Sequence, residues 1–325
     1  MPSPALLPLA ASDPSFQGFV SVLSTPWTAV PGIAREHAIG VEAVRWRERL
    51  EQGGSAWLAV EGDTVLGAAV LERLAWDSEI FHRPVGHVAL FLPGGVSTDL
   101  VDAGRALLRR CLDAAGDARL EHLSVRVSAR EPAAAVASEE EGFRLLATKL
   151  VLALPIAARP VPALTGVTLR DLRTGEHEAF GELAAATSYP LSRFNLEPAF
   201  SAADKREFYR RWALDGARAW ARWTLVAEAA GSLLGYGLWR DGPTLPGDRP
   251  ARIVDHTLGG VLPERRREGI FEALTLFGLS RAAEHGYDYQ TGVVNVNNLA
   301  CQRAYLKLGA NLLGAHCTLH RRLSG

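Results

Sequence analysis

The sequence predicts an α/β fold that is built as two similar domains in tandem. Three observations carry this prediction. The same order of strand and helix patterns occurs twice, helix patterns alternate with strand patterns in each half, and a stretch rich in proline and small residues, 155–166, separates the halves. Strands joined by crossover helices are typical of α/β domains. A chain of 325 residues is long enough for two domains with ordinary cores.

In the first half, residues 57–73 read as a strand, a tight Glu-Gly-Asp turn and a second strand. A third strand pattern at 86–92 precedes a helix pattern at 100–116, which stops at a glycine. A further strand pattern follows at 122–128, and a second helix pattern then ends in another glycine, Gly142.

The second half repeats this order. Residues 225–240 form the strand–turn–strand pattern, 252–261 the next strand, and 269–286 the glycine-terminated helix. Residues 289–296 form the following strand, and aligning Gly309 with Gly142 keeps the final strands in register without a gap. Solenoid repeats are much shorter than this, so we expect a duplicated domain, divided as 1–158 and 159–325.

Bulk properties exclude several classes of function. The 35 basic and 36 acidic side chains leave a net charge of −1, which argues against a general nucleic-acid or membrane-surface role. Three scattered cysteines predict neither a disulfide framework nor a zinc site, so no metal is expected. The N-terminus lacks a basic segment and is interrupted by prolines, and no apolar run reaches the length of a membrane span, so we expect a cytoplasmic protein.

A candidate anion site lies where the strand 252–261 runs through a proline turn into Arg266-x-x-Gly269 and a helix. The first amides of a helix lack partners within it, and its dipole favours anions. A glycine lets a phosphate approach the backbone, and arginines add charge-assisted bonds. The pattern predicts a diphosphate site, with a solvated loop as the alternative. It is neither a Walker A loop nor a dinucleotide fingerprint, because their required residues are missing.

A second motif, NNLACQRAYLKLGA, spans 297–310. Together the two motifs resemble those of the GCN5-related N-acyltransferase family, whose members use acyl-coenzyme A. The family's loop, V-x-P-x-x-R-G-x-G-I-G, is matched by Val261, Pro263, Arg266, Gly269 and Ile270. Its late motif, N-x-x-A-x-x-L-Y-x-K-x-G-F, is matched at Asn298, Tyr305, Lys307 and Gly309, with Cys301, Ala304 and Ala310 as substitutions. In the loop, Arg267 replaces a common glycine and Phe271 replaces a small residue.

The resemblance implies that each domain is a mixed, mostly antiparallel twisted sheet flanked by helices. It implies acetyl-coenzyme A or another acyl-coenzyme A as cosubstrate. The implied cofactor contacts are Leu258, Gly260, Val261, Arg266, Arg267, Glu268, Gly269, Ile270, Asn298 and Cys301. Leu258 and Val261 are expected to offer backbone amides, at a bulge marked by Gly259 and Gly260.

Direct acyl transfer to an amine needs a base, a donor to the oxyanion and an acid for the thiolate. The resemblance makes Tyr305 the acid. Asp255 and His256 are the candidate bases, with a water relay as a third possibility. Strand alternation places Asp255, Thr257 and Gly259 on one face and Val254, His256 and Leu258 on the other, so only one of the two bases faces the substrate directly.

The acceptor is expected to be a small amine. Residues 192–212 and 76–81 resemble segments of bacterial acyltransferases that modify the 4-amino group of a dTDP-linked deoxysugar. This resemblance suggests as acceptor-site residues Ser192, Arg193, Asn195, Glu197, Trp76 and His82. The alternatives are an antibiotic, an aminoglycoside or another small amine, or a non-catalytic acyl-coenzyme A sensor. No nucleic acid or membrane partner is expected, and the chain is expected to be a monomer or a homodimer.

The first half lacks these residues. The register that aligns the glycines puts Ser138 at the place of Tyr305 and Glu131 at that of Asn298. It puts Asp99 and Asp102 at the places of the loop arginine and glycine. Acidic residues at a helix start repel a diphosphate. We therefore expect the first domain to bind no coenzyme A and to help shape the acceptor site.

Overall fold

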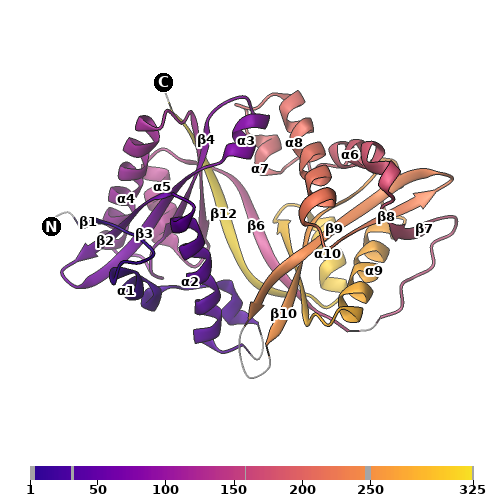
Figure 1. Cartoon of the computed structure of the whole chain (residues 1–325), viewed down its shortest axis with the longest axis horizontal. Coiled ribbons are helices and arrows are strands. Elements are labelled where there is room, and N and C mark those ends of the chain that lie inside the picture. The colour runs from indigo at the N-terminus through magenta and orange to yellow at the C-terminus, as the bar shows by residue number, and fades with distance from the viewer. Residues whose placement is uncertain (1–3, 31–32, 158, 246–249, 324–325) are drawn as a thin grey trace. The chain divides into compact units, whose positions relative to one another are not determined.

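The computed structural model describes residues 4–30, 33–157, 159–245 and 250–323 (Figure 1). It divides into two compact units, Met1–Leu150 with Leu313–Gly325, and Val151–Leu312. This grouping differs from the linear division drawn from the sequence, whose boundary residue, 158, lies outside the described residues. The C-terminal residues join the first unit because β12 (Asn311–Arg322) pairs antiparallel with β5 (His122–Ser128), from His316↔Ser128 to Arg322↔His122.

The first unit is a mixed sheet with helices on both faces. Its strand order is β1-β2-β3-β4-β5-β12, followed by β6; β4 and β5 pair in parallel, whereas β1–β2, β2–β3, β3–β4 and β5–β12 pair antiparallel. The remaining strands are β1 (Ala5–Pro8), β2 (Ser55–Glu61), β3 (Thr64–Arg73), β4 (Val85–Phe91) and β6 (Arg144–Pro155). The helices are α1 (Ser15–Val22), η1 (Pro26–Ala29), α2 (Arg35–Glu51), α3 (Ala75–Ile80), α4 (Thr98–Asp117) and α5 (Pro132–Glu140).

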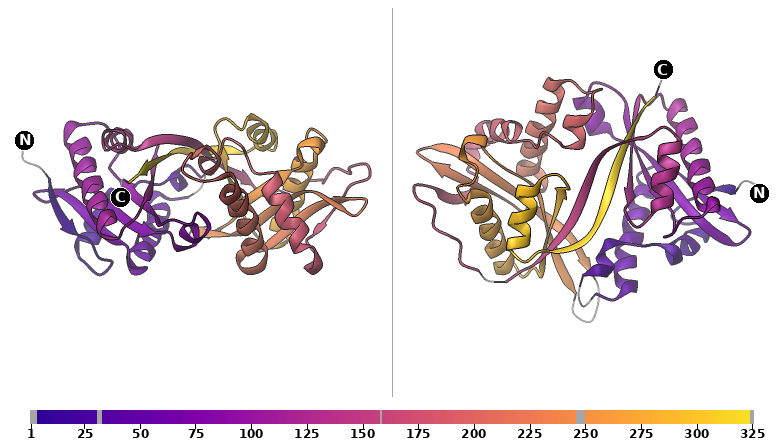
Figure 2. Two further views of the ribbon diagram at one scale, coloured as in Figure 1. Left: turned by 90° about the horizontal axis from the view of Figure 1, so that it is seen from above. Right: turned by 180° about the vertical axis from the view of Figure 1, so that it is seen from behind.

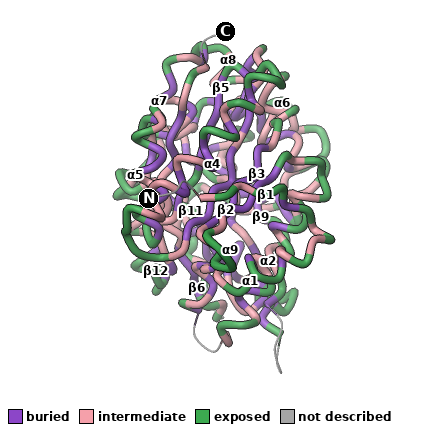
Figure 3. Tube along the Cα trace, turned by 90° about the vertical axis from the view of Figure 1, so that its left-hand side faces the viewer, coloured by how far each residue is buried: buried purple, intermediate pink, exposed green. Residues whose placement is uncertain are grey.

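Strand alternation divides the core of this unit into two layers. Trp57 and Ala59 of β2 pack with α4 and α5, whereas Ala56 and Leu58 pack with α1 and α2. Because both faces are covered, β2, β3 and β4 are buried almost continuously, as the purple segments in Figure 3 show.

The second unit repeats the plan. From β6, its strand order is β11-β10-β9-β8-β7, with β10 and β11 parallel (Figure 2). The strands are β7 (Thr168–Asp171), β8 (Trp223–Ala229), β9 (Ser232–Leu245), β10 (Ala251–Val261) and β11 (Tyr289–Asn295). The helices are η2 (Thr174–Glu176), α6 (His177–Ala186), α7 (Arg193–Leu196), α8 (Ala202–Asp215), η3 (Gly216–Trp220), η4 (Pro263–Arg265), α9 (Ile270–Glu284) and α10 (Leu299–Lys307).

Helix α9 covers one face of this sheet, through a core that includes Leu225, Val254 and Leu274. Helices α6 and α8 cover the other face, through a core that includes Val226 and Leu238. These two faces are named the α9 face and the α6 face below.

The internal repetition is confirmed. In each unit a helix joins the two parallel strands, β4-α4-β5 and β10-α9-β11, and a second helix follows and ends at a glycine. Gly142 and Gly309 have φ values of 79° and 82°, the left-handed conformation that glycine adopts without a steric penalty. The predicted α/β fold with two tandem domains is therefore confirmed. Within the described residues, no helix is long and apolar enough to cross a membrane.

Candidate functional site

A fork between β10 and β11 is the central feature of the second unit. The parallel ladder runs from Ile253↔Tyr289 to His256↔Gly292. Beyond that pair the two described strands continue unpaired with each other, β10 to Val261 and β11 to Asn295. Backbone groups on the inner edges of two diverging strands are free to bind an extended chain. The fork is therefore a candidate ligand site.

The ladder with β9 decides which groups of β10 face the fork. Leu262 donates its amide to the carbonyl of Leu234, at 2.9 Å. Hydrogen-bonded pairs alternate in an antiparallel ladder, so Gly260 and Leu258 also direct their backbone groups to β9. Gly259 and Val261 point the other way, into the fork. Val261, which was expected to offer its amide, does face the fork, whereas Leu258, which was expected to do the same, directs its backbone groups to β9. Gly260, an expected cofactor contact, also directs its backbone groups to β9, and Gly259 faces the fork.

A β-bulge in β10 lies between His256 and Leu258. The extra residue reverses the alternation, so Leu258 packs on the α6 face with Val226 and Leu238. Uninterrupted alternation had placed Leu258 beside His256, and that prediction was wrong beyond the bulge. Gly259 is on the same side as His256, because a Cβ added to it would lie 2.8 Å from His256 Nε2. The bulge precedes the two glycines that were expected to mark it.

On the α9 face, the hydroxyl of Tyr305 lies at the closed end of the fork. It is 2.8 Å from Nδ1 of His256, and a Cβ added to Gly292 would lie 2.6 Å from it. The imidazole stacks on Trp239, with ring centroids 4.3 Å apart and an interplanar angle of 13°. Burial lowers the pKa of His256 to about 4, so the ring is neutral at neutral pH. Burial also raises the pKa of Tyr305 well above its ordinary value.

Asp255 points to the opposite face of β10, as alternation predicts. Thr291 donates its hydroxyl to the Asp255 carboxylate, and Arg240 Nε lies 3.4 Å from the other carboxylate oxygen. Asp255 is half-buried and Arg240 is exposed. The two candidate bases therefore have different surroundings: His256 is dry and bonded to Tyr305, whereas Asp255 is an ion-paired carboxylate on the α6 face.

The three consecutive arginines make different contacts. Arg265 forms a two-point ion pair with Glu268, with bonds of 2.8 and 2.7 Å, so this carboxylate is engaged within the loop. Arg266 donates from Nε to the carbonyl of Val261, at 3.4 Å. Arg267 is exposed. Gly269 is the N-cap of α9 with φ 81°, so it has no side chain to occupy the first amides of the helix, and Ile270 is buried in the core behind them.

Arg267 has a φ of 70°, in the left-handed region that favours glycine. A residue with a Cβ is destabilised there by about 1 kcal/mol. We expect Arg267→Gly to raise the stability by several tenths of a kcal/mol, since the greater freedom of glycine in the unfolded chain offsets part of the relief. Urea unfolding of the variant and the wild type would measure the difference. A less stable variant would contradict this reading of the loop.

Asn298 is the N-cap of α10, and its Oδ1 accepts the amide of Cys301 at 3.2 Å. Burial raises the pKa of the Cys301 thiol to about 12, so it is not a thiolate nucleophile at neutral pH. Asn298 and Tyr305 are therefore on one short helix whose start is fixed by a cap.

The polar residues predicted to line the acceptor site are largely engaged in the local fold. Ser192 caps α7 by accepting the amide of Asn195, and it also accepts the hydroxyl of Tyr209 at 2.6 Å. The Asn195 amide donates to the carbonyl of Tyr189 at 2.8 Å. Two further contacts are the Glu197 carboxylate with the Ala199 amide, at 3.0 Å, and the Arg193 guanidinium 4.2 Å from the Phe194 ring.

Several residues of the site escaped the sequence reasoning. Trp239 donates from Nε1 to Oε1 of the buried Gln290, at 2.7 Å. Tyr189 donates its hydroxyl to Oδ1 of Asn297, at 3.1 Å, and so ties the segment after α6 to the start of α10. No local sequence signal reveals these pairs, because their members lie 51 and 108 positions apart.

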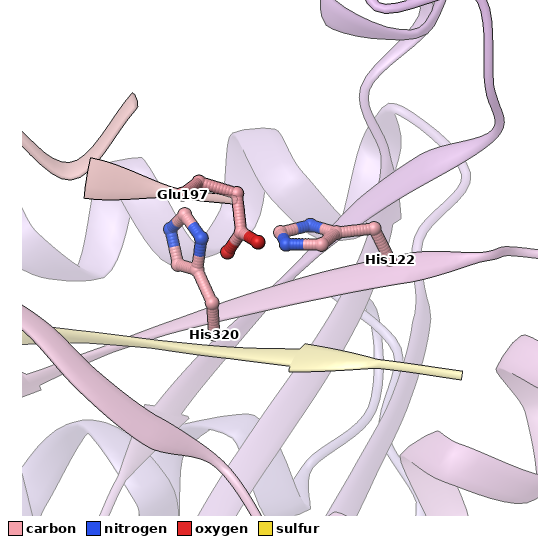
Figure 4. A group of neighbouring side chains, drawn as sticks. All are labelled: His122, Glu197 and His320. Carbon is pink, nitrogen blue, oxygen red and sulfur yellow. The ribbon is translucent and has the colours of Figure 1, made fainter. Parts of the chain in front are cut away.

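The remaining candidates lie in the first unit. Trp76 is half-buried on α3, and His82 is exposed just after it, with φ 49°. His122 of β5 and His320 of β12 pack edge to face, with centroids 4.8 Å apart (Figure 4). Glu197, also drawn there, belongs to the second unit. Two imidazoles are fewer than the three or four ligands that protein zinc sites use, so this pair alone defines no metal site.

The comparisons with known proteins bear on the fold. No protein-family model matches the sequence, and no curated protein matches it. A GCN5-related N-acetyltransferase from Sphaerobacter thermophilus superposes with a TM-score of 0.66 at 15% identity, over 98% of this chain and 95% of its own. A tandem GNAT protein from the clavulanic acid biosynthesis pathway gives 0.59 at 16% identity, over 99% of both chains.

A third solved structure is a GCN5-related glucosamine N-acetyltransferase region of a fungal multi-domain β-N-acetylglucosaminidase. It gives a TM-score of 0.61 at 11% identity, over 99% of this chain and 38% of that one. At such identities the likeness concerns architecture. The chain therefore has the fold of the GCN5-related N-acetyltransferases, with two such units in tandem.

Proposed function

We propose that this protein is an acyl-coenzyme A-dependent N-acyltransferase that transfers acetyl, or another short acyl group, to a small amine. One observation carries the proposal: a buried tyrosine hydroxyl, that of Tyr305, lies at the closed end of a strand fork. The fork opens beside a helix start with a glycine cap and basic residues, Gly269 and Arg266. An anionic group and a reactive group on one extended molecule would fit these two places.

The residues fit the parts of an acyl-coenzyme A. The first amides of α9 and the Arg266 guanidinium offer donors to a diphosphate. The backbone groups of Gly259 and Val261 offer strand-like bonds to the amide-containing pantetheine arm, and Asn298 stands at the start of α10. The bound molecule supplies a thioester, whose carbonyl carbon is the electrophile.

The chain then moves two protons. The amine attacks the thioester and loses a proton, for which the Asp255 carboxylate on the α6 face is the proposed acceptor. When the carbon–sulfur bond breaks, its electron pair stays on sulfur, and Tyr305 supplies the proton that makes the thiol. His256 is not proposed as the base for the amine, because it is buried on the α9 face and bonded to Tyr305.

The acceptor class that we favour is an amino sugar, and more specifically an amino sugar linked to a nucleotide. The resemblance of 192–212 to amino-sugar acyltransferases supports it, as does the structural likeness to a glucosamine N-acetyltransferase region. The test is thiol release from acetyl-coenzyme A with glucosamine, a nucleotide-linked amino sugar, an aminoglycoside and simple alkylamines. Thiol release with only the aminoglycoside and the simple alkylamines would refute the proposed amino-sugar acceptor. Tight binding of acetyl-coenzyme A without thiol release in the presence of any of these amines would favour the alternative, a non-catalytic acyl-coenzyme A sensor.

The first unit is proposed to bind no coenzyme. Its equivalent helix, α4, is capped by its own side chain, since Ser97 Oγ accepts the amide of Leu100, and Asp99 lies in its first turn. Ser138 is buried and donates to the carbonyl of Ala134 within α5. Both differences support a stoichiometry of one coenzyme per chain, which calorimetric titration would measure.

Arg266→Ala should weaken coenzyme A binding by about tenfold, because a charge-assisted bond to phosphate contributes roughly 1.5 kcal/mol. Calorimetry measures the affinity directly. Arg218→Ala, an exposed arginine on η3, is the matched control and should bind like the wild type. Equal affinities in all three proteins would mean that Arg266 only supports the loop through its bond to Val261.

A further inference from the structure

Gln290 is a fully buried polar side chain whose position the reaction outlined above does not explain. It lies on β11 with no exposed surface, two residues before Gly292. Its Oε1 accepts the indole N–H of Trp239, which is equally buried. An indole N–H can only donate, so this bond fixes the amide with its oxygen toward Trp239 and its NH₂ group away.

The NH₂ group of Gln290 lacks a fully formed hydrogen bond to any described residue. The Tyr305 hydroxyl lies against Gly292, which strand alternation places on the same face of β11 as Gln290. Burial raises the pKa of Tyr305 and, in keeping with this placement, the Gln290 side chain lowers it by a smaller amount. A buried donor without a partner is unfavourable by about 1–3 kcal/mol, so such a group calls for a functional explanation. The phenol oxygen of Tyr305, on the same face of β11, is the acceptor that we assign to this donor.

Burial makes Tyr305 a poor acid, and this is a difficulty for its proposed role. A model thiol has a pKa near 8.5 and a phenol near 10. Desolvation raises the pKa of Tyr305 further. A thiolate that leaves into the same apolar pocket is desolvated as well, so the proton transfer stays uphill by about the difference between the two model values. The transfer becomes more favourable if the pocket stabilises the phenolate that it leaves behind.

We propose that His256 and Gln290 are positioning residues that stabilise the phenolate form of Tyr305, and that Trp239 holds Gln290 in place for this. The inference rests on the proposed acyltransferase reaction. In the step concerned, the phenolic O–H bond breaks, the thiolate sulfur gains the proton, and the negative charge stays on the Tyr305 oxygen. The phenolate recovers a proton from solvent after the thiol departs.

The arrangement suits charge that develops during the reaction. Nδ1 of His256 lies 2.8 Å from the phenol oxygen, and a proton on Nδ1 makes it a donor. The opposite ring nitrogen lies against Gly237 and Gly259 and forms no hydrogen bond of ordinary geometry within the described residues. Against the larger effect of burial, which lowers the pKa of His256, the Leu258 backbone also interacts with the ring and raises this pKa. Donors that bind more strongly after the charge forms accelerate the step that forms it.

The supporting side chains are held rigidly, which such a role requires. Trp239 is packed so closely against Gly237 and Gly278 that a Cβ at either position would collide with its ring. His256 is sandwiched between Trp239 and Phe271, with ring centroids 4.3 and 5.9 Å away. The donors therefore need little rearrangement when the charge appears.

The test uses the full chain and varies the leaving group. Gln290→Leu and Trp239→Phe should lower kcat at least tenfold with acetyl-coenzyme A, with KM for it changing less than threefold. With an acetyl thioester of a strongly acidic aryl thiol, the same variants should approach the wild type, because such a thiolate departs without a proton. A purely structural defect would persist with both donors.

Matched variants separate the bond from the packing. Trp223→Phe removes the same atoms from an indole that stacks beside Trp239 but makes no bond to Gln290, and it should keep wild-type kcat. His256→Asn keeps a donor near the place of Nδ1 and should retain most activity, whereas His256→Leu should not. Circular dichroism would exclude unfolded variants from the comparison.

The outcomes distinguish the two proposals. If no variant, including the wild type, releases thiol with any amine, the proposed function fails. If Tyr305→Phe is impaired with acetyl-coenzyme A and rescued by the aryl thioester, but Gln290→Leu and Trp239→Phe behave as wild type, the phenolate inference fails alone. Equal loss in Trp223→Phe and Trp239→Phe would also overturn it.

Discussion

Tyr305→Phe lowers turnover with acetyl-coenzyme A by about 100-fold or more, while the affinity for the coenzyme stays within twofold of the wild type. General acid catalysis contributes factors of about 10²–10⁴, and the phenylalanine ring keeps the packing against His256 and Phe271. Loss of kcat without loss of binding identifies an interaction used in the transition state. Thiol-release kinetics and calorimetry measure the two quantities.

Tyr287→Phe is the control for this experiment. Tyr287 is a mostly buried tyrosine of the same unit, whose hydroxyl is bonded to Asp241 instead of facing the fork. Its loss should affect stability and leave kcat unchanged. Wild-type turnover by Tyr305→Phe would remove Tyr305 as the acid and, with it, the observation on which the proposed function depends.

The sequence predicted the features that depend on neighbouring residues. Glycines that end helices, such as Gly142 and Gly309, occupy the left-handed conformations that their positions suggested. The glycine cap of α9 and the asparagine cap of α10 were also readable, because a cap depends on a few consecutive residues.

Other features depend on contacts that no local pattern encodes. The bulge after His256 inserts one residue into β10, and the polarity pattern of the sequence does not mark it. The bulge reversed the face of the strand predicted for Leu258. The pairing of β12 with β5 joins segments almost 200 residues apart, and a linear domain boundary cannot express it. Gln290 looked like an ordinary strand residue until the fold placed Trp239 beside it.

The acceptor residues show a different weakness of reading motifs. Ser192, Asn195 and Glu197 were predicted because residues 192–212 resemble a segment of amino-sugar acyltransferases. Serine, asparagine and acidic residues also cap helices and bridge turns, and these three do so here. Polarity alone could not separate the two roles. Their proposed contact with an acceptor therefore needs support beyond the motif.

Glu131→Gln should stabilise the protein at alkaline pH and leave it nearly unchanged near pH 4. Glu131 stands in the first unit at the place of Asn298 and is only 5% exposed. Burial raises its pKa from 4.5 to about 8, although bonds from Ser24 and from the Leu92 backbone oppose the shift. The folded protein therefore binds this proton more tightly than the unfolded chain does.

The sign of the effect follows from this difference. Below the unfolded pKa of 4.5 both states hold the proton, and Glu131 contributes no pH dependence. As the pH rises toward about 8, only the unfolded chain releases it freely, so the stability of the wild type falls. Each pKa unit corresponds to about 1.4 kcal/mol, so the loss is on the order of 5 kcal/mol by pH 9. Glutamine carries no titrating proton and escapes this loss.

Urea unfolding of both proteins at several pH values between 4 and 9 measures the difference, and subtracting one curve from the other cancels the other titrating groups. Ser24→Ala is the companion variant: it removes a bond that favours the charged form, so it should steepen the fall of stability with pH. Parallel curves for the wild type and Glu131→Gln would show that Glu131 is hydrated. In that case water would reach the position in the first unit that corresponds to Asn298 in the second unit. The proposal that the first unit binds no coenzyme would then lose the support of a dry, carboxylate-occupied position there.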